Sequence, residues 1–333
     1  MDQNINTGEL SLRRLRKNHL TRELVQEIQL SEKNFVQPYF VVDGIANPQP
    51  IAGLTDNYRE TSESILNKIE SDIERGVRKI LLFGVPQKKH ATEFNYDFIC
   101  NEINSIKKRF GDDIWVATDV CLCSSTNHGQ CGIIKLSGDA IDNQKTVRAL
   151  TEQAVLFAQA GTDCIAPSDM MDGRIHSIRT ALNKNGFEDK IIMSYAAKFN
   201  SNFYGPFREA ANSAPKGDIK LKDRSTYQID FARPTDALLS SIRDYQEGAD
   251  ILMIKPGLPY LDVLKELSST IKKPWAAYEV SGEYAAIELM AKQGLTSGPQ
   301  AHLESWTALK RAGASIIISY GSRYARQWIQ GDY

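Results

Sequence analysis

The sequence predicts a (β/α)8 barrel, also called a TIM barrel, with an extended N-terminal arm. The chain has 333 residues, which is long for an ordinary domain but normal for a barrel enzyme. Eight short segments are almost continuously apolar, as expected for parallel strands that are covered on both faces. Segments with an apolar helical stripe alternate with them, and this alternation favours an α/β fold with a parallel sheet.

The predicted strands are the eight apolar segments in chain order. They are Val36–Val42, Lys79–Val85, Ile114–Val120, Cys164–Pro167, Ile191–Ala197, Ile251–Ile254, Trp275–Val280 and Ser315–Tyr320. Three of the helices between them end at Gly76, Gly161 and Gly248, because glycine just past the last turn favours a helix stop. A doubly wound open sheet is the main alternative, but no Gly-x-Gly-x-x-Gly motif follows the first strand.

Two segments lie outside this alternation. Residues 1–34 are polar and partly helical, and we predict that they form an arm for oligomerisation whose basic residues are a solvated face or a subunit contact. Residues 35–333 then form the catalytic barrel. Within the barrel, residues 199–233 follow the fifth strand with little periodicity, and such a long irregular connection is predicted to be an active-site lid.

The composition argues against several classes of function. With 40 basic and 41 acidic residues the net charge is −1, which gives no field to attract nucleic acid or an anionic membrane. No apolar segment approaches membrane-spanning length, and the polar N-terminus has no apolar signal-peptide core. An odd number of cysteines, five, argues against a disulfide framework. We expect a cytoplasmic protein that binds neither nucleic acid nor membrane.

Two lysines, Lys198 and Lys255, end the fifth and sixth predicted strands, where a barrel places its active site. Either lysine alone could be a salt-bridge partner at the barrel mouth. Two adjacent ammonium groups repel each other, however, so the pKa of at least one should be low. A neutral lysine amine can attack a ketone and form a Schiff base. Other polar residues at strand ends are Asp119, Ser168, Asp169, Ser281 and Tyr320.

Three cysteines, Cys121, Cys123 and Cys131, follow the third strand just after Asp119. Thiolates at this spacing suit zinc, and three protein ligands leave a fourth position open, which is the catalytic arrangement. A closed structural site would need another ligand, for which His128 is the obvious local candidate. Buried inert thiols are the alternative interpretation.

The predicted lid carries Arg208, Arg224 and Gln228. Arginines bind carboxylates through paired hydrogen bonds, although those on surface loops are often plain surface charges. A ketone substrate that bears a carboxylate would suit both the lysines and these arginines.

Taken together, these motifs resemble the porphobilinogen synthase family, also called delta-aminolevulinic acid dehydratase, in its zinc-dependent branch. The matching segments cover nearly the whole chain: Arg13–Arg16, Leu82–Pro86, Asp119–Gly132, Ala166–Arg174, Ser194–Lys198, Phe203–Ala210, Met253–Gly257 and Val280–Tyr284. The resemblance implies a (β/α)8 barrel that condenses two molecules of 5-aminolevulinate into porphobilinogen, with loss of two waters, in tetrapyrrole (heme) biosynthesis. It also implies a homo-octamer in which the arm wraps a neighbouring subunit.

The resemblance also implies roles for individual residues. Lys255 would hold one substrate as a Schiff base, and Lys198 would serve the other substrate. The three cysteines would hold a catalytic zinc ion that acts as a Lewis acid, while Asp119 and Ser168 would orient substrate or relay protons. The implied substrate-binding residues are Tyr204, Phe207, Arg208, Arg224, Gln228, Ser281 and Tyr320.

The chain departs from the family pattern at three informative positions. Zinc-dependent relatives usually have histidine where this chain has Gln130, and some of them bind a second zinc through that histidine and a cysteine at the position of Thr226. Both ligands are absent here, so we expect no second zinc. Many bacterial relatives bind an allosteric magnesium through a glutamate at the position of Ser240, so we expect no magnesium activation there.

Two alternative functions stay open on sequence alone. A class I aldolase-like barrel would use one Schiff-base lysine and no metal, but it would leave the clustered cysteines without a role. A non-catalytic, zinc-stabilised scaffold protein would have a closed four-ligand site and no reactive lysine.

Overall fold

The structure, a computed structural model, describes residues 12–217 and 220–332. Residues 1–11 of the predicted arm, residues 218–219 of the predicted lid and residue 333 therefore lie outside the described residues.

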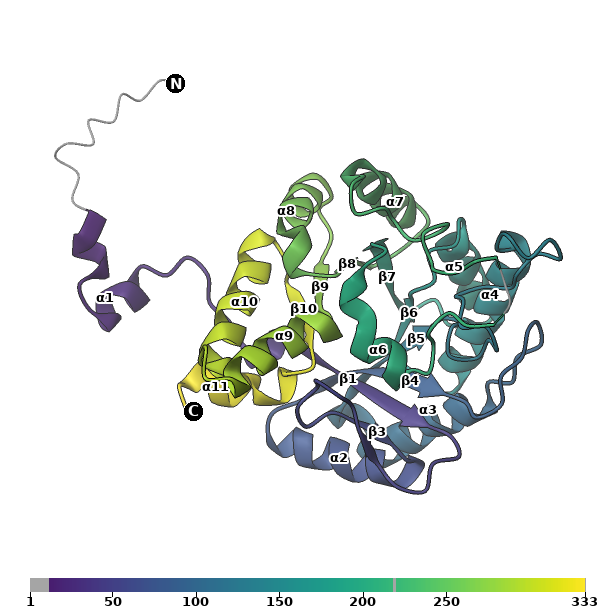
Figure 1. The fold of residues 1–333 in the computed structure, drawn as a ribbon, viewed down its shortest axis with the longest axis horizontal. Coiled ribbons are helices and arrows are strands. Elements are labelled where there is room, and N and C mark those ends of the chain that lie inside the picture. Colours follow the sequence, from purple (N-terminus) through teal and green to yellow (C-terminus); the bar gives the residue numbers. More distant parts are fainter. Residues whose placement is uncertain (1–11, 218–219, 333) are drawn as a thin grey trace.

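Eight parallel strands form a closed barrel, which confirms the predicted fold class (Figure 1). In chain order they are β1 (Phe35–Val42), β4 (Lys79–Val85), β5 (Trp115–Val120), β6 (Cys164–Pro167), β7 (Ile191–Lys198), β8 (Ile251–Lys255), β9 (Trp275–Glu279) and β10 (Ile316–Ser319). Each strand pairs with its neighbour in sequence, and the pairing of β10 with β1 closes the barrel. The predicted strand limits differ from these by no more than one residue at either end.

Two short strands, β2 (Gln49–Pro50) and β3 (Tyr58–Glu60), were not predicted from the sequence. β3 pairs parallel to the end of β1, and β2 pairs antiparallel to β3, so both extend the sheet outside the barrel. Neither has the continuous apolar run of a buried barrel strand, because β2 is exposed and β3 is mostly half-buried. Their sequences therefore carry no periodic signal.

Helices cover the outside of the barrel. They are α2 (Ser62–Glu74), α3 (Asp97–Phe110), α4 (Asn143–Gln159), α5 (Arg174–Lys184), α7 (Pro234–Gln246), α8 (Leu261–Thr270), α9 (Ser281–Lys292), α10 (Gly298–Ala312) and α11 (Ala325–Gln330). The predicted stops at Gly76, Gly161 and Gly248 are confirmed. These glycines have φ values of +106°, +100° and +104°, which other residues rarely adopt.

The apolar core has two parts. The larger part lies between the strands and the surrounding helices, and the smaller part fills the barrel interior. Near the strand ends the interior is aromatic: Phe83 lies 5.1 Å from both Phe40 and Phe207, measured between ring centroids. Phe207 belongs to the segment that follows β7, so this segment packs its apolar side directly on the rings of the barrel interior.

The predicted lid begins after β7 and returns to it. It contains a 3-10 turn, η5 (Asn202–Tyr204), and a short helix, α6 (Gly205–Ala210), which lies over the middle of the barrel in Figure 1. The amide of Ile229 donates to the carbonyl of Lys198 at 3.1 Å, and the amide of Asn200 donates to the carbonyl of Ile229 at 2.8 Å. Both ends of the segment are therefore fixed beside Lys198.

The start of the described N-terminal segment is helical and stands clear of the barrel (Figure 1), whereas its end packs on the barrel, where Asn34 accepts a hydrogen bond from Lys310 at 2.8 Å. It contains η2 (Leu12–Arg16), α1 (His19–Leu24) and η3 (Glu32–Asn34). Its leucines before residue 25 are more than half exposed, at 55% for Leu12, 54% for Leu15, 65% for Leu20 and 85% for Leu24. Among the helices of the described residues, none combines the length and apolarity needed to cross a membrane.

Candidate active site

The two strand-end lysines are direct neighbours. Lys198 on β7 and Lys255 on β8 are partners in the register of the two strands. Both side chains are buried, at 5% and 3% exposure. The ammonium of Lys198 donates a hydrogen bond to the backbone carbonyl of Ser168, which follows β6. A carbonyl group thus holds the amine of Lys198, whereas the amine of Lys255 is surrounded by aromatic rings.

Lys255 lies in an aromatic cage made of four rings. Its Nζ is 4.1 Å from the ring centroid of Tyr278, 4.6 Å from that of Phe207, 5.2 Å from that of Tyr195 and 5.4 Å from that of Tyr204. No hydrogen bond links this Nζ to another described residue. Burial, reinforced by the charge of Lys198, lowers the pKa of Lys255 to about 7. A large share of this amine is therefore neutral, and nucleophilic, near neutral pH.

Asp119 faces the same region from the end of β5. Burial raises the pKa of Asp119 to about 6, although Lys198 and a hydrogen bond from Ser168 act in the opposite direction. Its Oδ1 is buried and has no hydrogen-bond partner in the part of the chain that the structure describes. A carboxyl group with such a pKa can both accept and donate a proton near neutral pH.

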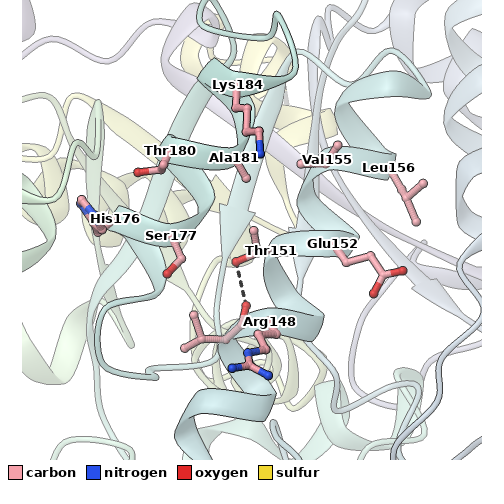
Figure 2. A pocket seen from close by; sticks show the side chains of 11 residues that line it. Arg148, Thr151, Glu152, Val155, Leu156, His176, Ser177, Thr180, Ala181 and Lys184 are labelled. Atoms are coloured by element: carbon pink, nitrogen blue, oxygen red, sulfur yellow. Dashed lines mark hydrogen bonds between the residues drawn. The ribbon is translucent and has the colours of Figure 1, made fainter.

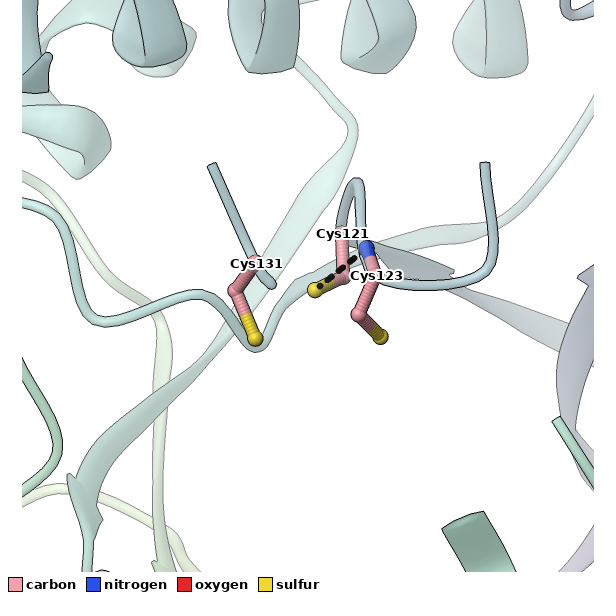
Figure 3. Close-up of side chains that lie close together, drawn as sticks. All are labelled: Cys121, Cys123 and Cys131. Atoms are coloured by element: carbon pink, nitrogen blue, oxygen red, sulfur yellow. Dashed lines mark hydrogen bonds between the residues drawn. The ribbon is translucent and has the colours of Figure 1, made fainter. Parts of the chain in front are cut away.

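The three cysteines of the metal loop, which we define as residues 121–131, converge on one point (Figure 3). The Sγ atoms of Cys121, Cys123 and Cys131 all lie within 4.8 Å of one another, and all three residues are buried. Three thiols at this separation fit a single ion with tetrahedral thiolate coordination. Among the described residues, this group alone has the geometry to hold a metal ion.

His128, the candidate fourth ligand, is not part of the thiol cluster. Its Nδ1 accepts a hydrogen bond from the backbone amide of Gln130 at 3.1 Å, and its buried Nε2 has no described partner. An ion held by these three thiols would therefore have a fourth position open for substrate or water.

Arg208, Arg224 and Gln228 extend from the lid towards this region. Arg224 is 2% exposed, and its Nη2 donates to the carbonyls of Gly129 at 2.9 Å and Ser213 at 2.7 Å. Arg208 is half-buried and donates to a lid carbonyl at 3.3 Å. Gln228 is 3% exposed, and neither atom of its amide has a partner among the described residues.

The remaining predicted residues lie on the side of Lys255. Ser281 begins α9, and its Oγ accepts a hydrogen bond from the amide of Phe207 at 3.0 Å. Tyr320 follows β10, and its hydroxyl is 3.2 Å from that of Tyr278. The hydroxyl of Tyr204 donates to the carbonyl of Lys255 at 3.1 Å, which holds the lid on β8.

Several buried polar atoms from the strand ends and the lid lack hydrogen-bond partners among the described residues. They are Asp119 Oδ1, Tyr195 Oη, Arg208 Nε, Arg224 Nε, and Gln228 Oε1 and Nε2. Buried polar atoms in folded proteins are nearly always paired. Those named here can therefore bond to a polar ligand.

Comparisons with known proteins agree with this geometry. The family model described as "Delta-aminolevulinic acid dehydratase" matches residues 9–328. The chain belongs to the delta-aminolevulinic acid dehydratase family. The delta-aminolevulinic acid dehydratase of Helicobacter pylori is 42% identical over 96% of this chain and 98% of its own length. That of Bacillus subtilis is 39% identical over 95% of this chain and 97% of its own length.

A solved structure shows the same likeness in three dimensions. The delta-aminolevulinic acid dehydratase (porphobilinogen synthase) of Toxoplasma gondii, in complex with the reaction product porphobilinogen, superimposes with a TM-score of 0.92 at 36% identity. The match covers 98% of this chain and 93% of that one. The family resemblance inferred from the sequence motifs is thereby confirmed.

The sequence motifs of the family did not identify two residues of the aromatic cage, Tyr195 and Tyr278. Both are fully buried in the barrel interior. Both lie within predicted strands, Ile191–Ala197 and Trp275–Val280, whose apolar residues were all interpreted as core. Their positions in the sequence could have identified them, because Tyr195 precedes Lys198 by three residues and Tyr278 precedes Ser281 by three. Tyrosines that near the end of a barrel strand can reach its mouth.

The motif analysis also missed the connection between Asp169 and Arg174. Nε of the buried Arg174 lies 3.4 Å from Asp169 Oδ2, and its Nη2 lies 2.8 Å from Oδ2 of Asp244 on α7. Loss of one partner would leave an uncompensated buried charge. This network therefore holds the segment after β6, which carries Ser168, against its neighbours.

A groove of about 710 Å³ on the outside of the barrel is separate from this site. It lies between α4 and α5, and Figure 2 shows Thr151 and Glu152 on one wall with His176 and Thr180 on the other. None of its lining residues is at a strand end. The candidate active site lies instead beneath residues 199–233, and its polar atoms are buried.

Proposed function

We propose that the protein condenses two molecules of 5-aminolevulinate into porphobilinogen with loss of two waters. The observation that carries this proposal is the pair of buried lysines, Lys198 and Lys255, in register on adjacent strands beside three converging thiols. A condensation of two keto acids needs two places for carbonyl chemistry, and this arrangement supplies them. Membership of the family supports the same reaction.

Lys255 acts as the nucleophile towards the first substrate. Its neutral amine attacks the keto carbon, and loss of one water gives a Schiff base. The pKa of Lys255, lowered to about 7 by burial and by Lys198, supplies the neutral form. The aromatic cage excludes water and so protects the Schiff base from hydrolysis.

Lys198 serves the second substrate, with Asp119 and Ser168 beside it. Lys198 can form a second Schiff base or stabilise the developing charge on the keto oxygen. Because burial raises the pKa of Asp119 to about 6, this carboxyl group can hold a proton and pass it to a leaving hydroxyl. Ser168 bonds to Asp119 and fixes its orientation.

The lid binds the carboxylate of the second substrate. Arg208 and Arg224 carry the positive charge, and the free amide of Gln228 supplies a further donor. On the other side, Ser281 and Tyr320 bind the carboxylate of the substrate held by Lys255. The rings of Tyr204 and Phe207, which lie beside Lys255, form the wall of this substrate site.

One zinc ion, held by Cys121, Cys123 and Cys131, belongs to this proposal. Its support is the donor set, three buried thiols within 4.8 Å of one another, because soft thiolates select zinc over harder cations. When bound, zinc would supply Lewis-acid polarisation of the second substrate.

No second zinc and no allosteric magnesium are part of the proposal. The side chain of Gln130 is fully buried and hydrogen-bonded to the lid, and Thr226 is exposed. At the magnesium position, the hydroxyl of Ser240 accepts a hydrogen bond from Arg243 at 3.2 Å. Arg243 also pairs with Asp172, so a guanidinium already neutralises the acidic charge of this region.

We further propose that the protein is a cytoplasmic homo-octamer whose N-terminal arm, residues 1–34, packs against a neighbouring subunit. The support is the row of exposed leucines on the described part of the arm, which includes Leu12, Leu15, Leu20 and Leu24. Apolar side chains gathered on one segment mark a contact surface. Sedimentation of the full chain, compared with a chain lacking the arm, tests this assembly.

The test of function is porphobilinogen formation from 5-aminolevulinate by zinc-loaded protein and by protein stripped with a chelator. Product that disappears on stripping and returns with zinc is the expected result. Product that is indifferent to stripping would keep the reaction but remove the proposed role of the metal. No product from folded, zinc-loaded protein would refute the proposal and return the single-lysine, aldolase-like enzyme as the alternative.

A further inference from the structure

The side chain of Gln130 joins the metal loop to the lid. Gln130 is fully buried, and its Nε2 donates to the lid carbonyls of Leu221 at 3.0 Å and Asp223 at 3.1 Å. Its Oε1 accepts from the hydroxyl of Tyr227 at 2.7 Å. Every polar atom of this side chain therefore bonds to the lid, although the residue itself belongs to the metal loop.

Tyr227 carries the connection back to a metal ligand. Its hydroxyl accepts a hydrogen bond from the backbone amide of Cys131 at 3.1 Å and donates to Gln130. The position of the lid and the position of the Cys131 backbone are thus linked through two hydrogen bonds in series. A displacement of either segment breaks contacts of the other.

The backbones of the two segments are also in close contact. The amide of Lys216 donates to the carbonyl of His128 at 3.1 Å. A Cβ at Gly129, where φ is +73°, would lie 2.4 Å from the carbonyl oxygen of Ala214. There is no room for a side chain at this position. From the metal loop it is the side chain of Gln130 that bonds to the lid, while Tyr227 and Arg224 bond from the lid to the loop.

We propose that Gln130 is a positioning residue that couples closure of the lid to metal binding by the three cysteines. This inference rests on the proposed zinc site. A metal ion that fixes Cys131 also fixes Gln130 and Tyr227, and these two residues then hold the lid closed. Because coupling is reciprocal, a closed lid must in turn raise the affinity of the thiols for the metal.

The test is limited trypsin digestion of the full-length protein, zinc-loaded and chelator-stripped, with cleavage sites mapped by mass. The lid offers exposed lysines at 216, 220 and 222. In the wild type, stripping should speed cleavage at these lysines by roughly tenfold, which corresponds to the loss of about one net hydrogen bond. In Gln130→Ala and in the isosteric Gln130→Glu, cleavage should be fast with zinc and nearly independent of it.

Asn127→Ala is the matched control. Asn127 lies in the same loop, but its side chain is exposed and makes no hydrogen bond to the described residues. It should keep the wild-type dependence of cleavage on zinc. Zinc affinity, measured by competition with a chromogenic chelator, should fall by a similar factor of roughly ten in the Gln130 variants alone.

Two results would overturn the inference. One is cleavage of the wild-type lid that does not depend on zinc, and the other is a Gln130→Glu protein that keeps the full zinc-dependent protection. Neither readout uses turnover. A protein that makes no porphobilinogen but shows the coupling would refute the proposed function and leave the role of Gln130 intact.

Discussion

The lowered pKa of Lys255 predicts how its reaction with ketones depends on pH. An ordinary lysine with a pKa of 10.5 is neutral in about one molecule in 3,000 at pH 7, whereas one with a pKa of about 7 is half neutral. Burial and the neighbouring charge of Lys198 therefore raise the concentration of the reactive amine roughly a thousandfold. Since the neutral amine is the nucleophile, the rate should rise with pH and level off above about pH 7.

Reductive trapping with levulinate and cyanoborohydride measures this reaction directly, with the modified lysine located by mass. The initial rate should reach half of its plateau near pH 7, and Lys255→Met should show no trapping at this position. In Lys198→Met the neighbouring positive charge is absent, so the pKa of Lys255 should rise and the midpoint should move to higher pH. A wild-type midpoint above pH 9, or one that Lys198→Met leaves in place, would refute this account.

Three further predictions concern other residues. Asp119→Asn should lower kcat and remove the pH dependence near 6 in the steady-state profile, because burial places the pKa of this carboxyl there; an unchanged acidic limb would contradict its role. Cys131→Ala should lose zinc, measured by elemental analysis, and most activity, while circular dichroism keeps the folded signal; normal turnover without metal would show that the thiols are not catalytic. Glu283→Gln should lower kcat and destabilise the protein by about 2 kcal/mol in denaturant titration, since this buried carboxyl group, whose pKa burial raises to about 8, accepts from the amide of Val280 and from the amides of Gly257 and Leu258, which follow Lys255. The control Glu304→Gln, an exposed glutamate on α10, should change neither quantity.

The barrel and the position of its polar strand ends were predictable from the sequence. A strand buried on both faces reads as a continuous apolar run, so β1 and β4 to β10 could be located to within one residue. The fold then places all their C-terminal ends at one mouth. For that reason Lys198 and Lys255, separated by the whole lid in sequence, could be expected to lie near each other.

The surroundings of these lysines were not predictable in the same way. Tyr195 and Tyr278 have the pattern of core residues, and only the register of the closed barrel brings both rings to Lys255. The contacts of Gln130 were hidden for a related reason. A comparison of motifs reports that a histidine is missing, but it cannot report that the amide in its place bonds to lid carbonyls 91 and 93 residues away.

Arg224 is a charged residue that the candidate site buries without a carboxylate partner. Its guanidinium is fully buried and donates to two backbone carbonyls, yet no carboxylate among the described residues pairs with it. A buried cation without a counter-ion is costly in free energy. Burial lowers the pKa of Arg224, but the nearby Cys131, whose own pKa lies well below its usual value, outweighs this effect, so the pKa of Arg224 is raised and part of the cost is offset. A substrate carboxylate would offset more, and it would also satisfy the unpartnered Nε. We therefore expect the proposed lid to be stabilised by Cys131 and a substrate carboxylate together, because the fold here maintains a charge for chemistry rather than for packing.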